Sequence, residues 1–97
     1  MNGKNLNNEQ IVENEIEGFK FVLFNNGDEN MYQTLNITFK GVLRSIEVIA
    51  PIDFSQIISA IIESKDLNGF IKAIKGCWND GIIEKSINGL FDEINGL

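Results

Sequence analysis

The chain contains no histidine and only one cysteine, Cys77. Histidine is the commonest general base near neutral pH and the commonest protein ligand of metals, so its absence removes the usual centre of acid–base catalysis. Zinc sites built from cysteine and histidine are excluded. A single cysteine forms no internal disulfide, which favours a reducing compartment. We therefore predict a protein that is not an enzyme and holds no metal or cofactor.

Long apolar runs and clusters of basic residues are missing as well. No segment approaches the ~20 apolar residues of a membrane span, and the first ten residues, MNGKNLNNEQ, lack the apolar run of a signal peptide. Eight basic residues stand against fourteen acidic ones, giving a net charge of −6. This balance disfavours direct binding to nucleic acid. We expect a cytoplasmic protein, whose acidity serves either a basic protein partner or solubility alone.

The chain has room for one domain. Its 97 residues lie within the usual domain size of about 50–250 residues, and a hydrophobic content of 43% supports a packed core. Residues 1–12 are polar, rich in asparagine and without periodicity, which predicts a flexible N-terminal tail. Residues 13–97 are predicted to form a single α+β domain.

Apolar and polar residues alternate in three successive segments, 15–24, 31–40 and 42–50, which predicts three β-strands. The mixed pattern of the third segment leaves its inward face open, and Gln33 is the one polar residue on the inner face of the second. The turn signals Asn26–Gly27 and Lys40–Gly41 separate the segments without a helix-length insertion, so the strands are expected to pair antiparallel. The side chains predicted to face the core are Phe19, Phe21, Leu23, Met31, Leu35, Ile37 and Phe39.

After Pro51 the apolar spacing changes to that of a helix. Asp53 with Gln56 resembles a capping box, and Asp66 is a second candidate N-cap. The predicted fold is a three-stranded antiparallel β-meander packed against two to three C-terminal helices, of order βββααα. The three apolar stripes are Phe54, Ile57, Ile58, Ile61 and Ile62; Leu67, Phe70, Ile71, Ile74 and Trp78; and Ile83, Ile87, Leu90, Phe91 and Ile94.

Cys77 and Trp78 are adjacent, and each is the only residue of its type. A cysteine nucleophile usually needs a neighbouring base such as histidine, so Cys77 is predicted to be a small buried hydrophobic residue. Trp78 ends the second apolar stripe and is predicted to pack in the core. The alternative for Trp78 is a partly exposed indole that anchors a protein interface.

Acidic residues suggest where a partner would bind. Glu13, Glu15 and Glu17 alternate along one predicted strand face, which indicates a solvated face or edge rather than a catalytic pair of carboxylates. Two further acidic pairs lie in the predicted hairpin loop and on the last helix. These are the predicted partner-binding residues: Asp28, Glu29, Asp92 and Glu93.

One stretch of the second helix resembles a known family. It reads Phe-Ile-x-Ala-x-Lys-x-x-Trp-Asn after a three-stranded meander, and it resembles the small acidic type II anti-CRISPR proteins of phages. The N-terminal segment departs from that pattern because it lacks a helix. The resemblance implies a DNA mimic, whose carboxylates occupy the basic groove of a CRISPR effector nuclease. The matching positions are Phe70, Ile71, Ala73, Lys75, Trp78 and Asn79.

These features together predict a small non-enzymatic binding protein with a basic protein partner. The resemblance implies that the partner is a CRISPR effector nuclease, and that the chain blocks nucleic-acid binding by acidic mimicry in the host cytoplasm. The alternative is an oligomerising structural or accessory protein of a phage or mobile element. Such a protein would form a homodimer through an exposed sheet edge or through apolar helix surface that the core leaves uncovered.

Overall fold

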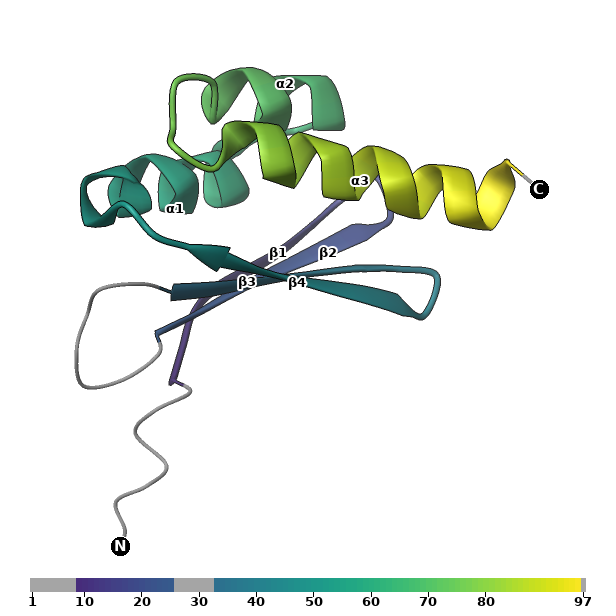
Figure 1. Cartoon of the computed structure of the whole chain (residues 1–97), viewed down its shortest axis with the longest axis horizontal. Coiled ribbons are helices and arrows are strands. Elements are labelled where there is room, and N and C mark those ends of the chain that lie inside the picture. Colours follow the sequence, from purple (N-terminus) through teal and green to yellow (C-terminus); the bar gives the residue numbers. More distant parts are fainter. Residues whose placement is uncertain (1–8, 26–32, 97) are drawn as a thin grey trace, which may run out of the picture.

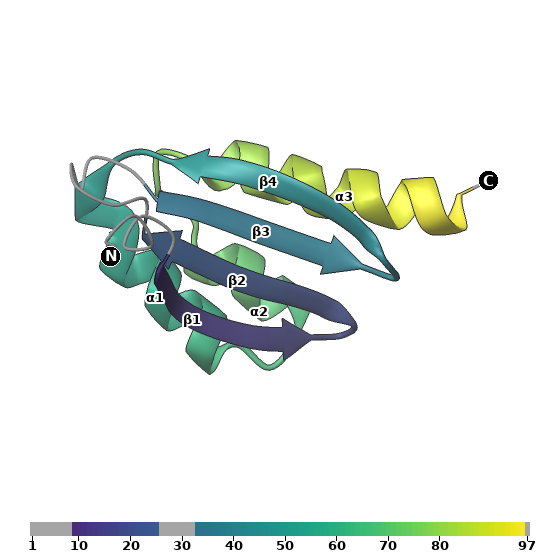
Figure 2. The same ribbon diagram turned by 90° about the horizontal axis from the view of Figure 1, so that it is seen from below.

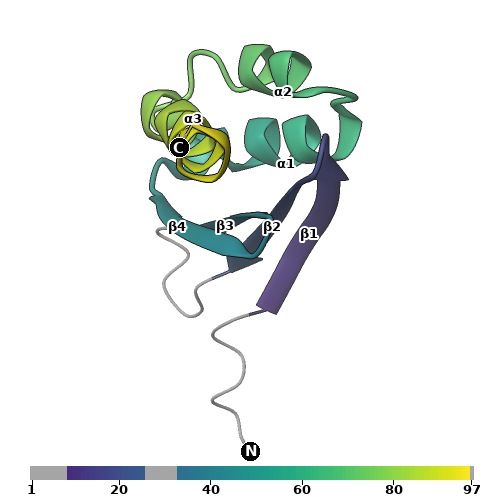
Figure 3. The ribbon, with the colours of Figure 1, turned by 90° about the vertical axis from the view of Figure 1, so that its right-hand side faces the viewer.

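The computed structural model describes residues 9–25 and 33–96. These residues form a four-stranded antiparallel sheet, with strands in the order β1-β2-β3-β4, followed by three helices that lie over one face of the sheet (Figures 1 and 3). The predicted α+β class is confirmed, but the predicted number of strands is wrong by one. The elements are β1 (Glu9–Ile16), β2 (Phe19–Asn25), β3 (Gln33–Phe39), β4 (Val42–Val48), the 3-10 turn η2 (Pro51–Asp53), α1 (Phe54–Glu63), α2 (Leu67–Ala73) and α3 (Asp80–Asn95).

The additional strand is β1, which pairs with β2 along its length. It begins at Glu9, so residues 9–12 belong to the sheet and not to the predicted tail, and the rest of that tail, residues 1–8, lies outside the described residues. A two-residue turn joins β1 to β2: Glu17 has φ 51° and Gly18 has φ 86°, the same values as at the predicted turn Lys40–Gly41. Positive φ at both positions gives the tight hairpin turn that suits the twist of antiparallel strands. Because glutamate rarely opens such a turn, the sequence reads as one strand through Gly18.

The inner face of the described strands carries the core predicted from the alternation, whereas Met31 and the predicted turn Asn26–Gly27 lie outside the described residues. Phe19 and Phe39 stack with their ring centroids 4.0 Å apart, and Phe21 meets Phe70 of α2 at 4.5 Å. Gln33 is buried on this face, as expected. The open question of β4 is answered by its burial pattern, because Ile46 and Val48 are buried whereas Leu43 is exposed. The buried sheet residues are Val12, Ile16, Phe19, Phe21, Leu23, Leu35, Ile37, Phe39, Ile46 and Val48.

Each helix buries the central part of its predicted stripe. The buried helix residues are Ile57, Ala60 and Ile61 of α1, Phe70 of α2, and Ile83, Ile87 and Leu90 of α3, with Ile74 just after α2. The prediction that Trp78 packs in the core is wrong, because 76% of this residue is exposed. Helix α2 ends at Ala73, and Gly76 with φ 96° redirects the chain, so helical spacing no longer describes Trp78.

One of the two predicted N-caps is present. Asp66 accepts a hydrogen bond from the backbone N–H of Gly69 at 2.7 Å, which caps α2 as expected. Asp53 does not cap α1 with its side chain. The turn that starts at Pro51 gives Asp53 helical φ and ψ, and its carboxylate instead accepts a hydrogen bond from the backbone N–H of Trp78 at 2.7 Å.

Among the described residues, no helix lies over the second face of the sheet, as Figure 2 shows. This face is largely polar, and the hydroxyl of Ser45 on β4 donates a hydrogen bond to Asn36 on β3 at 2.6 Å. An antiparallel sheet with one packed face and one solvated face is a common arrangement. Within residues 9–25 and 33–96, no helix is both long enough and apolar enough to cross a membrane.

Candidate functional site

A row of glutamates runs along β1, the strand at one edge of the sheet. Glu13 and Glu15 are exposed on one face of this strand, separated by about 7 Å as alternate residues of a strand are. Glu17 follows in the turn to β2 and is also exposed. The exposure of all three side chains confirms that they are solvated, but the strand face carries only Glu13 and Glu15, because Glu17 lies in the turn. We call Glu13, Glu15 and Glu17 the acidic edge.

The carboxylate of Glu13 lies 3.0 Å from the ammonium group of Lys20 on the neighbouring strand. The hydrogen bond and the charge of Lys20 hold the pKa of Glu13 below its ordinary value, with a smaller contribution from the hydrogen bond donated by Gln10. In the part of the chain that the structure describes, Glu15 and Glu17 form no ion pair. Two of the three charges of the acidic edge are therefore available to a partner.

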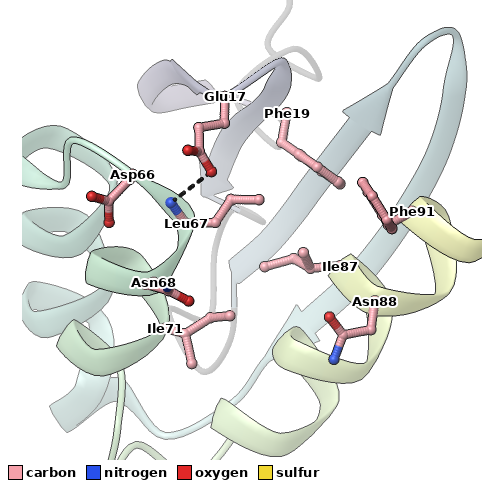
Figure 4. A pocket seen from close by; sticks show the side chains of 9 residues that line it. All are labelled: Glu17, Phe19, Asp66, Leu67, Asn68, Ile71, Ile87, Asn88 and Phe91. Carbon is pink, nitrogen blue, oxygen red and sulfur yellow. Dashed lines mark hydrogen bonds between the residues drawn. The ribbon is translucent and has the colours of Figure 1, made fainter.

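The acidic edge ends at a groove between α2 and α3, with a volume of about 340 Å³ (Figure 4). Phe19 and Ile87 form the buried part of its floor, and the ring of Phe91 forms a half-exposed wall beside Phe39, with centroids 6.2 Å apart. We call this hollow the α2–α3 groove. Its lining is Phe19, Leu67, Ile71, Ile87 and Phe91 on the apolar side and Glu17, Asp66, Asn68 and Asn88 on the polar rim.

Hydrogen bonds to α2 hold the two carboxylates of the rim in place. Glu17 accepts from the backbone N–H of Leu67 at 3.3 Å, and Asp66 accepts from that of Gly69 at 2.7 Å. Each of these bonds uses one carboxylate oxygen. The groove thus combines an apolar floor with two positioned negative charges, and this arrangement suits an apolar side chain with a basic neighbour.

The predicted partner-binding residues are only partly placed by the structure. Asp28 and Glu29 lie outside the described residues. Asp92 and Glu93 are exposed near the end of α3, and Glu93 forms an ion pair with Arg44 of β4. Reasoning from the sequence missed the α2–α3 groove, because its lining comes from a turn, a strand and two helices that are distant along the chain.

Cys77 is buried, as predicted for a small hydrophobic residue. Burial raises the pKa of its thiol, and the carboxylates of Asp53 and Asp80 raise that pKa further. The thiol is therefore held in its protonated, unreactive form. In the described ranges no group of three or more histidine, cysteine, aspartate or glutamate side chains could hold a metal ion.

We expect the raised pKa of Cys77 to make the protein less stable at alkaline pH. Because the thiol binds its proton more tightly in the folded than in the unfolded chain, its stabilising effect is complete below the unfolded pKa, ~8.5. That effect is lost as the pH rises toward the folded pKa. Urea denaturation at pH 7 and pH 9.5 should show a larger loss of unfolding free energy for the wild type than for Cys77→Ala. If the two proteins lose the same unfolding free energy between pH 7 and pH 9.5, ionisation of the Cys77 thiol does not affect stability.

No protein-family model matches the chain, and no curated protein or solved structure matches it. The resemblance to anti-CRISPR proteins therefore stays a prediction.

Proposed function

We propose that the chain is a small non-enzymatic binding protein that holds a basic segment of a protein partner. The observation that carries this proposal is the continuity of the acidic edge with the α2–α3 groove, since Glu17 belongs to both. Carboxylates in a row attract a basic segment over a long range. The apolar floor of the groove then adds contacts at short range.

The narrower form of the proposal names a type II CRISPR effector nuclease as the partner. It is supported by the net charge of −6 and by the resemblance at residues 70–79. An acidic row of this kind is suited to a channel lined by arginine and lysine that otherwise holds nucleic acid. In this form the chain acts in the cytoplasm of the host cell and competes with DNA for the channel.

Oligomerisation through the acidic edge is the less favoured function. Pairing β1 with β1 of a second copy would bring two rows of glutamates together, and like charges on facing strands are destabilising. Charged residues on an edge strand commonly prevent this kind of association. The acidic edge is thus better suited to a basic partner than to a second copy.

The experiment compares two double variants that each remove two negative charges. Glu15→Gln with Glu17→Gln neutralises the free part of the acidic edge, and Glu17→Gln keeps an oxygen that accepts from Leu67. We expect this variant to bind the effector about three- to tenfold more weakly in 0.15 M salt, since exposed charge pairs contribute about 0.2–1 kcal/mol each. Inhibition of DNA binding by the effector should weaken in parallel.

The matched control is Asp92→Asn with Glu93→Gln on α3, and we expect it to bind nearly as well as the wild type. If the α3 variant loses more affinity than the variant of the acidic edge, the partner binds at Asp92 and Glu93, the residues predicted from the sequence. If the wild type binds the effector undiminished in ~1 M salt, where the Debye length is ~3 Å, charge mimicry is the wrong mechanism. Absence of any binding would remove the effector as the partner.

A further inference from the structure

Four large apolar side chains are exposed near the end of β4, away from the acidic edge. They are Ile49, Ile52, Trp78 and Ile82, and the most exposed are Ile52 at 88% and Trp78 at 76%. Two hydrogen bonds join the segments that carry them: Trp78 N–H to the carboxylate of Asp53 at 2.7 Å, and Ile49 N–H to the side chain of Asn79 at 3.2 Å. Ile82 lies in the first turn of α3. We call these four residues the tryptophan patch.

The backbone around Trp78 is fixed on both sides. On one side, the backbone N–H of Cys77 donates to the carbonyl of Ile74 at 3.0 Å, and the Cys77 side chain is buried. On the other side, only 7% of Asn79 is exposed, and its amide group binds the backbone at Glu47 of β4 and at Ile49 just after β4. Trp78 is therefore presented to solvent from a fixed position.

An exposed indole on an ordered backbone is poorly explained by folding alone. Burying a tryptophan removes about 150–250 Å² from water, and the small side chain of Cys77 occupies the core at this point instead. Tryptophan is enriched among the residues that dominate binding at protein interfaces. Because the segment is already ordered, binding through Trp78 costs little conformational entropy.

Two carboxylates lie beside the tryptophan patch, and the ammonium group of Lys75, three residues before Trp78, lies 3.9 Å from the carboxylate of Glu84. The carboxylate of Asp53 accepts from the N–H of Trp78 itself, and that of Asp80 accepts from the N–H of Gly76 at 2.9 Å. Both carboxylates also help to raise the pKa of Cys77, after the larger effect of burial. An exposed indole attracts lysine and arginine side chains by cation–π contact, and carboxylates bonded to the backbone at and near this residue add an attraction by charge.

The tryptophan patch lies beside the end of β4, whereas the acidic edge lies on β1 at the other edge of the sheet, and Glu17 is at the opposite end of the strands from the patch. The register pairs Phe19 with Phe39 at the end near Glu17, whereas Gln33 pairs with Val48 at the end near the patch. Seven-residue strands separate these ends by about 20 Å. One surface can therefore be occupied without covering the other.

We propose that the tryptophan patch is a second docking surface, which binds an amphipathic segment of a protein partner that carries lysine or arginine beside its apolar residues. Trp78 is the anchor, Ile49, Ile52 and Ile82 supply the surrounding apolar contact, and Asp53 and Asp80 select the basic residues. This surface does not depend on the identity of the partner at the acidic edge.

The test uses the emission of Trp78, the only tryptophan of the chain. The probe is a synthetic amphipathic helical peptide of leucine and lysine, and the comparison is a peptide of the same pattern with glutamate in place of lysine. We expect a saturable blue shift with the lysine peptide, and at least about tenfold weaker binding of the glutamate peptide. Ile52→Ser should weaken binding of the lysine peptide about fivefold, without shifting the emission of Trp78 in the free protein.

Calorimetric titration extends the test to Trp78→Ala, which should lose at least about tenfold in affinity while its circular dichroism stays that of the wild type. The variant Glu15→Gln with Glu17→Gln should bind the peptide as the wild type does.

If that variant loses binding and Trp78→Ala does not, the peptide lies on the acidic edge and the inference fails. A blue shift that grows with protein concentration alone would identify a second copy as the occupant and overturn it too. Equal binding of both peptides, or no shift, would also overturn it.

Discussion

Replacing Phe70 by alanine is expected to lower the free energy of unfolding by about 3–5 kcal/mol. Phe70 is fully buried on α2, and its ring contacts that of Phe21 in the sheet, with centroids 4.5 Å apart. The substitution removes the main apolar contact of the shortest helix with the sheet and leaves a cavity. A domain of this size is stable by only about 5–15 kcal/mol, so the variant is expected to retain little stability.

Equilibrium urea denaturation measures this loss, and the slope with urea concentration should stay unchanged if the variant remains two-state. Phe91→Ala on α3 is the matched control, because it is the same substitution at a residue that is 51% exposed. We expect the control to lose about 1 kcal/mol or less. If Phe70→Ala costs no more than Phe91→Ala, the contact between Phe70 and Phe21 does not hold the helical layer on the sheet.

The core could be predicted from the sequence because burial on one face leaves a periodic pattern. Phe19, Phe21 and Leu23 alternate with polar or less buried residues in β2, and they are buried as expected. The helical stripe of α3 likewise predicted Ile83, Ile87 and Leu90. These predictions need only the direction of side chains within one element. They do not depend on how distant segments meet.

In strand β1 the alternation of apolar and polar residues is weaker than in β2. Only Val12 and Ile16 are buried on its inner face, and Asn14 lies between them. Asn14 is at this position because its side-chain amide donates a hydrogen bond to the carbonyl of Ile61 in α1 at 2.8 Å. A polar residue that serves a contact between distant segments interrupts the alternation, so the pattern alone did not separate the strand from a tail.

The functional surfaces were hardest to predict because each is assembled from distant segments. The α2–α3 groove joins Glu17 to residues 66–71 and 87–91. At the tryptophan patch, Asp53 bonds to a backbone group 25 residues further along the chain and so does not form the expected capping box. Helical spacing placed Trp78 in the core because it assumed a helix that continued past Gly76.

Asn79 joins the helical layer to the sheet, and its replacement by alanine is expected to cost about 2–4 kcal/mol. Its amide oxygen accepts from Ile49 N–H at 3.2 Å, and its amide nitrogen donates to the carbonyl of Glu47 at 3.1 Å. The truncation leaves two half-buried backbone groups, one in β4 and one just after it, without this partner. Only 7% of Asn79 is exposed, so water cannot easily replace the lost hydrogen bonds.

The same substitution should also loosen Trp78, because Asn79 fixes the backbone on one side of it. We expect Asn79→Ala to show lower fluorescence anisotropy of Trp78 in the folded protein, together with weaker binding of the leucine–lysine peptide. The control is Asn88→Ala, the same change at an exposed position of α3, which should alter neither stability nor anisotropy appreciably. If Asn79→Ala loses stability but leaves the anisotropy and the peptide affinity unchanged, Asn79 stabilises the fold without positioning the tryptophan. If Asn79→Ala and Asn88→Ala lower the free energy of unfolding by the same small amount, the hydrogen bonds of Asn79 contribute no more to stability than an exposed asparagine does.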